Sequence, residues 1–130
     1  MTDYLPRYKH GASITRTASA AITGGQLLAV SGSGTVAPSG ANATNWVGVA
    51  AQDAASGAGV TVLSGGVQRL TTSGTVTAGD IVVCAAAGAV STLAVVSTPT
   101  AADVTNTRAI VGIALTTATT GLLVDVQMER

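Results

Sequence analysis

The strongest constraint on the fold of this chain is a stretch near its start that returns about halfway along. Residues 23–30 read TGGQLLAV, and residues 77–84 read TAGDIVVC, at a shift of 54. The same shift pairs several further positions, namely Gly11 with Gly65, Thr17 with Thr71, Ser19 with Ser73, Gly34 with Gly88 and Val36 with Val90. A stacked solenoid needs three or more units, so two long copies predict one body built from two similar halves.

The repeat continues at a different spacing near the end of each half. Residues 47–50 (VGVA) recur as residues 111–114 (VGIA), now at a shift of 64, so ten residues have been added to the second copy. We therefore expect a single β domain over 11–130 with halves 11–64 and 65–130. Residues 1–10 have no counterpart in either half and are expected to form an extended N-terminal arm.

Short runs of Val, Ile, Leu and Thr, separated by Gly, Ser, Asn and Pro, predict an all-β protein. The expected strands are 12–17, 26–30, 35–37, 45–50 and 58–63, followed by 66–71, 80–85, 89–93, 108–114 and 121–128. Glycines stand where the chain must reverse and are expected to form structural turns, at Gly25, Gly34, Gly79 and Gly88. One short helical turn is expected at 101–104. The halves predict a compact β-sandwich or partly closed barrel with a pseudo-two-fold axis.

The composition predicts an assembly of several copies. Charged residues make up 9% of the chain, the formal net charge is zero and Phe is absent. A core of Val, Ala, Leu and Ile leaves a small margin over chain entropy, because an Ala contributes much less than the roughly 1.5 to 3 kcal/mol of a buried Val or Leu. Burial against other subunits would supplement it, so we expect a homo-oligomer, with a trimer favoured.

The arm holds both tyrosines and the closest basic pair of the chain, and it permits two interpretations. It is either a disordered terminus or a segment that becomes ordered on a partner. In the second case Tyr4 and Tyr8 would be the anchors, and Arg7 and Lys9 would make the charge contacts. The sequence leaves both open.

No set of residues suggests catalysis, a cofactor or a metal site. His10 is the only histidine and lies in the arm, Cys84 is the only cysteine, and the carboxylates are scattered. Six basic residues are balanced by six acidic ones without aromatic interleaving, so no nucleic-acid partner is expected. No apolar run reaches the 18 or so residues of a membrane-spanning helix, so no membrane partner is expected either. These patterns predict that the protein is not an enzyme.

Several motifs resemble those of a known family, the small Gly/Ala-rich decoration, or cement, proteins of tailed-bacteriophage capsids. They are 21–26 (AITGGQ), 76–80 (VTAGD), the two strands 47–50 and 111–114, and 121–126 (GLLVDV), and the resemblance covers about 11–128. It implies a β-rich structural protein, typically trimeric, on the outer surface of the virion head. There it would bind the major capsid protein and tie neighbouring subunits together. The family has no catalytic residues to carry over.

Two other classes remain open from the sequence. A β-clip binding or assembly module uses a similar turn to that at 76–80, although such modules usually have a functional cleft or a longer chain. A β-rich adhesin or tail-fibre component would be expected to repeat more than twice.

Overall fold

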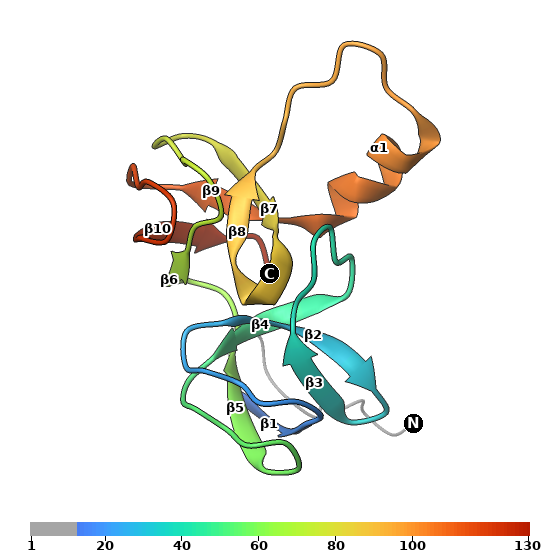
Figure 1. Ribbon diagram of the computed structural model, residues 1–130, viewed down its shortest axis with the longest axis vertical. Helices are drawn as coiled ribbons and strands as arrows, with labels where there is room; N and C mark the ends of the chain where they lie inside the picture. The colour runs from blue at the N-terminus through green and yellow to red at the C-terminus, as the bar shows by residue number, and fades with distance from the viewer. Residues whose placement is uncertain (1–12) are drawn as a thin grey trace, which may run out of the picture.

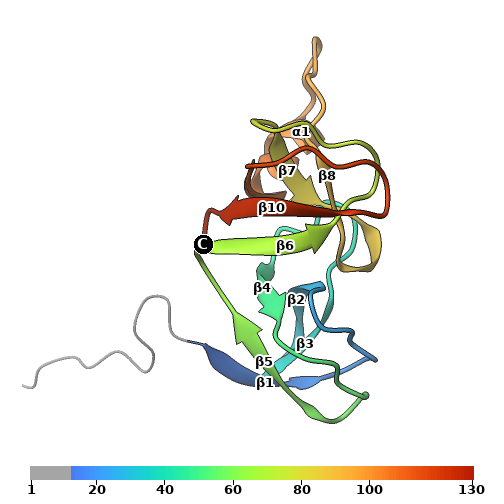
Figure 2. The same cartoon turned by 90° about the vertical axis from the view of Figure 1, so that its left-hand side faces the viewer.

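The computed structural model describes residues 13–130, which form two β units stacked one on the other (Figures 1 and 2). Strands β1–β5 make the unit at the bottom of both views, and β6–β10 make the unit above it. The predicted arm and its four candidate contact residues lie outside the described residues.

The first half is a closed barrel. Its strands are β1 (Ile14–Ala18), β2 (Leu27–Gly32), β3 (Thr35–Pro38), β4 (Trp46–Ala50) and β5 (Gly59–Leu63), in the order β1-β3-β2-β4-β5. The barrel closes through β1, which pairs with β5 antiparallel and with β3 parallel, with Ala18 opposite Val36. Every strand of this half therefore has two neighbours.

The second half is a five-stranded sheet with the same order of pairing. It contains β6 (Val67–Thr71), β7 (Ile81–Cys84), β8 (Val90–Thr92), β9 (Ile110–Ala114) and β10 (Leu123–Met128), in the order β6-β10-β9-β7-β8. A parallel bridge from Thr72 to Val90 repeats the contact between Ala18 and Val36 at the shift of 54. An internal duplication as the origin of this correspondence stays a prediction.

Helical structure is confined to short segments. The helical turn expected at 101–104 is part of α1 (Ala101–Asn106). Two 3-10 turns were not predicted, η1 (Ala86–Gly88) and η2 (Thr107–Ala109), because three residues leave no periodic signal in a sequence. Strands dominate the described residues, and the predicted all-β class is confirmed.

Trp46 joins the two halves. Its side chain is fully buried in a cluster made mostly of second-half residues, and its indole N–H donates a hydrogen bond to the Ile110 carbonyl oxygen at 3.2 Å. The Arg130 guanidinium lies 4.2 Å from the centre of the Trp46 ring and donates to the Trp46 carbonyl oxygen at 3.2 Å. The smaller core cluster is made of first-half residues alone and fills the barrel. The two halves thus share part of one core.

Candidate assembly surfaces

The four turn glycines all have a positive φ, but for two different reasons. At Gly25 (+88°), Gly34 (+75°) and Gly79 (+93°) an added Cβ would meet nothing within 4 Å, so the turn conformation itself favours glycine. At Gly88 (+71°) a Cβ would also lie 2.8 Å from the Gln26 Cβ. Gly88 therefore also allows the second half to approach the first closely.

Equivalent side chains of the two halves differ in burial. On the outside of the barrel, β2 and β4 present three apolar side chains that the second half buries, and we call these the covered face: Leu27, Trp46 and Val49. On the corresponding side of β7 and β9 lie their repeat equivalents, which we call the open face: Ile81, Ile110 and Ile113. A two-fold arrangement would bury both faces alike, so the expectation of a pseudo-two-fold axis is wrong for the packing of the halves.

The open face is uncovered. Ile81 is 44% exposed and Ile113 is 50% exposed, whereas their equivalents Leu27 and Val49 are 0% and 3% exposed. Strand register places Ile81 opposite Ile113, Ile113 opposite Gln127, and Gln127 opposite Val67, so a row of outward side chains crosses four strands. Ile81 and Ile113 are apolar neighbours in this row, and Gln127 separates them from Val67. Adjacent exposed apolar side chains mark an interaction site more often than an isolated exposed residue does.

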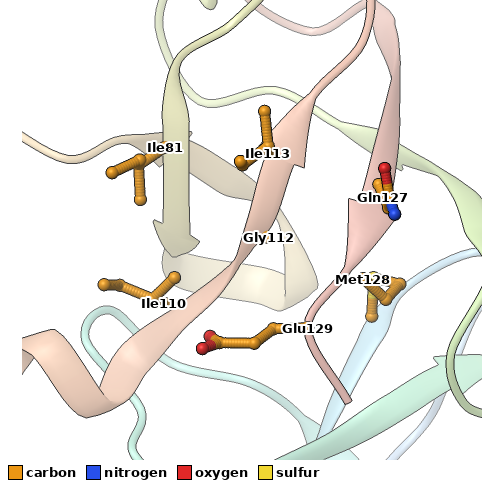
Figure 3. Close-up of a pocket in the computed structure, with 7 residues that line it drawn as sticks. All are labelled: Ile81, Ile110, Gly112, Ile113, Gln127, Met128 and Glu129. Atoms are coloured by element: carbon orange, nitrogen blue, oxygen red, sulfur yellow. The ribbon is translucent and has the colours of Figure 1, made fainter.

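A hollow of about 390 Å³ lies at the centre of the open face (Figure 3). Besides the three isoleucines of the open face it is lined by Gly112, Gln127, Met128 and Glu129. Gly112 allows β9 and β10 to approach closely beside the hollow, since a Cβ there would collide with the carbonyl oxygen of Gln127 on the next strand. Glu129, drawn below Ile113 in Figure 3, is the single charged residue among those that line it.

The neighbouring charges on this sheet cancel each other. Arg69 and Asp125 lie opposite each other on β6 and β10, and the Arg69 Nε is 3.3 Å from a carboxylate oxygen of Asp125. Their side chains are 74% and 36% exposed, so the pair stabilises the fold little. It does leave this part of the sheet without net charge.

The ten-residue insertion forms a segment that projects from the sheet between β8 and β9 (Figure 1). Its helix α1 has no buried residue, and Val95 and Val104 are exposed. Hydrogen bonds from the Thr100 backbone N–H and hydroxyl to the Asp103 carboxylate, at 2.6 and 2.9 Å, begin the helix and lower the pKa of Asp103. The segment is thus ordered by local contacts rather than by a core.

The described residues show little that could support chemistry. Among residues 13–130 no group of three His, Cys, Asp or Glu side chains could hold a metal ion. Burial raises the pKa of the Cys84 thiol to about 11, against smaller lowering effects of Ser39 and Arg130. No helix in this part of the chain has the length and apolar character needed to cross a bilayer.

Comparison with known proteins identifies the family. The model of the phage cement protein family matches residues 8–128, which is nearly the whole chain. The chain belongs to the phage cement protein family. A phage cement protein is a structural component of the virion capsid, and the family match favours this function over the β-clip and adhesin alternatives.

A solved structure of low sequence identity has the same fold. The N base of the head fiber protein gp8.5 of bacteriophage phi29 matches with a TM-score of 0.67 and 18% identity, over 91% of this cement protein and 93% of that chain. No curated protein sequence matches.

A cement protein acts by binding other proteins, so its functional sites are surfaces. From the sequence, the candidate contacts were expected in the arm, and the open face was not expected. Ile81 and Ile113 sit in strands whose local pattern equals that of the buried Leu27 and Val49, so local sequence offers no signal that separates them.

Proposed function

We propose that this cement protein binds the outer surface of the phage head as a homotrimer and ties neighbouring major capsid protein subunits together. The observation that carries the proposal is the exposed, uncharged row from Ile81 to Val67 on a chain of the phage cement family. A protein with a surface of this kind and few charges gains stability by burying that surface against other proteins.

The exposed row is large enough to matter for assembly. Ile81, Ile113 and Val67 are each about half exposed, so burying them contributes about 1 kcal/mol per side chain, or about 3 kcal/mol per copy. This free energy is a sizeable fraction of the free energy of unfolding of a small domain. It supports a homo-oligomer in which each copy covers part of another.

We assign attachment to the capsid to the N-terminal arm. Its supporting feature is composition, since Tyr4 and Tyr8 are apolar anchors with a polar end, and Arg7 and Lys9 can pair with acidic groups. Anchors of this kind commonly contribute about 2 kcal/mol or more each when they are buried centrally. Loss of the arm would then lower the affinity for heads by about two orders of magnitude or more.

We also infer that the role is structural and not catalytic. Within residues 13–130 the one thiol is buried and stays protonated at neutral pH, and no group of three His, Cys, Asp or Glu side chains could hold a metal ion. The family match points in the same direction.

The test is to mix undecorated heads with the full chain and with a chain that lacks residues 1–10, and to measure occupancy by quantitative gel and electron microscopy. We expect the full chain to decorate the heads and to raise their resistance to heat and to osmotic shock. The shortened chain should fold normally by circular dichroism and need about a hundredfold higher concentration. Full occupancy by the shortened chain at the same concentration would show that the arm does not attach the protein. Binding of neither chain would contradict the proposed function.

A further inference from the structure

The contact between the two halves of the chain shows what covers an apolar face of this type. The covered face of the first half is buried in a core cluster that includes Val82, Cys84 and Val90 of the β7–β8 hairpin. The turn of that hairpin, η1, contacts β2 and β3. The Gly88 N–H donates to the Ser39 carbonyl oxygen at 2.9 Å, and the Asn42 N–H donates to the Cys84 carbonyl oxygen at 3.0 Å. Cys84, on this hairpin, is 1% exposed.

The first half has the equivalent hairpin, but nothing in the described chain receives it. This is the β2–β3 hairpin, in which Val30 takes the position of Cys84, and Gly34 takes that of Gly88. Val30 is 45% exposed although it lies in the middle of β2. Residues 30–36 carry no charge. Within the chain, the β7–β8 hairpin thus packs against the covered face. The β2–β3 hairpin and the open face have no such partner among the described residues.

We propose that the β2–β3 hairpin of one copy docks on the open face of a second copy, and so repeats between chains the joint that holds the two halves of one chain together. The proposal rests on the homotrimer proposed above and names the contact that builds it. Each of the two exposed surfaces is the repeat equivalent of one side of an existing contact. A second copy of this chain therefore supplies an occupant whose counterpart is already seated on the covered face.

Charge and space agree with this occupant. The hairpin is uncharged, and among the residues lining the hollow only Glu129 is charged, so no like charges meet. The hollow of about 390 Å³ has room for a turn of small residues, and residues 31–35 (SGSGT) are small. The Arg69–Asp125 pair on the same sheet is already neutral within one copy.

The symmetry of the contact follows from its two different sides. A contact between a hairpin on one copy and a face on the next is heterologous, so it builds a ring when the rotation closes and a filament when it does not. A closed trimer contains three identical contacts of this type and leaves no hairpin or face unoccupied. The open face is then a surface between copies, and the arm remains free for the capsid.

Cysteine cross-linking between separate copies tests the contact directly. Val30→Cys and Ile113→Cys place thiols on exposed side chains of the two surfaces, while the native Cys84 is buried. The two variants, carrying different tags, are mixed under mild oxidation. Because a disulfide needs Cβ atoms about 4 Å apart, only neighbouring side chains will react. The matched control replaces Val30→Cys with Val95→Cys, whose side chain on the projecting segment is fully exposed.

We expect the Val30→Cys and Ile113→Cys mixture to form cross-linked pairs at least tenfold faster than the control mixture or either variant alone. The double variant in one chain should give covalent trimers on a denaturing gel. Equal rates in the test and control mixtures, in a protein that sediments as a trimer, would overturn the proposed contact and leave the trimer intact. Rapid pairing of Ile113→Cys with itself would also overturn it, because like surfaces would then meet.

A second measurement does not depend on disulfide geometry. Ile113→Lys adds a charge to an exposed position of the open face, and Val95→Lys makes the same kind of change on the projecting segment. We expect sedimentation to show at least tenfold weaker association for Ile113→Lys and unchanged association for Val95→Lys, with equal circular dichroism. Unchanged association of Ile113→Lys would overturn the contact. A monomeric wild-type protein would overturn both the contact and the trimer, while head binding, measured separately, would still test the cement function.

Discussion

Replacing Trp46 should show how strongly the two halves depend on each other. Its side chain is fully buried, donates to the Ile110 carbonyl oxygen and stacks against Arg130. Trp46→Ala removes the largest side chain of the core, a loss that typically costs about 3 to 5 kcal/mol. We expect the upper end of that range, since the Ile110 carbonyl oxygen loses its donor and the Arg130 guanidinium loses the ring that it lies against.

Trp46→Phe is the control that separates packing from hydrogen bonding. Phenylalanine keeps a ring beneath Arg130 but has no N–H to donate to Ile110. The expected cost is therefore that of one unsatisfied buried acceptor and some lost volume, about 1 to 3 kcal/mol. For a chain of this size each kcal/mol lowers the melting temperature by about 4 °C. Trp46→Ala should then melt about 15 °C or more below the wild type, and Trp46→Phe about 4 to 12 °C below it.

The measurement is thermal and urea unfolding by circular dichroism at one fixed protein concentration, because association shifts apparent stability. Fluorescence cannot serve, since Trp46 is the chain's only tryptophan. A single transition in the wild type would support the prediction of one domain over 11–130. Two separate wild-type transitions, or a cost below about 1 kcal/mol for Trp46→Ala, would refute the reasoning that the halves are held together by a core shared through this residue.

Four further substitutions probe the turns, the hollow and the thiol. Gly25→Val and Gly79→Val should each lower the free energy of unfolding in urea by about 1 to 3 kcal/mol, because only the positive φ opposes the new side chain. The two losses should be similar, and unequal losses would contradict this reasoning. Gly112→Ala should cost about 3 kcal/mol or more, since its Cβ would collide with the Gln127 carbonyl, and a neutral result would contradict that geometry. Cys84 should react with a thiol reagent only after unfolding. Folding raises the pKa of Cys84 from 9.0 to about 11, because the thiol is buried. The free energy of unfolding should therefore be unaffected by this thiol below pH 9 and fall by about 3 kcal/mol between pH 9 and pH 11, where only the unfolded chain loses the proton. Cys84→Val should abolish that fall.

Much of the fold could be predicted from the sequence because the signals that determine it are local. Alternation of apolar residues and glycines at the reversals placed the strands within a few residues of those observed, as at 26–30 for β2 and 45–50 for β4. Closure of the barrel depends on which strand ends meet, a non-local property, so the sequence left a sandwich and a partly closed barrel as alternatives. The open face could not be predicted for the same reason. Ile81 and Leu27 have similar neighbours, and only the position of the other half decides which one is covered.

The closure of the first barrel has a consequence for crowding on a head. Where copies of a protein lie close together, a free strand edge invites one sheet to grow into the next. Both strands of the β2–β3 hairpin already have partners on each side within the barrel, so their backbone groups have no open row to offer. A second copy that docks on this hairpin can then meet its two strands only through side chains. Such contacts have a fixed extent, and a single substitution can weaken or strengthen each one.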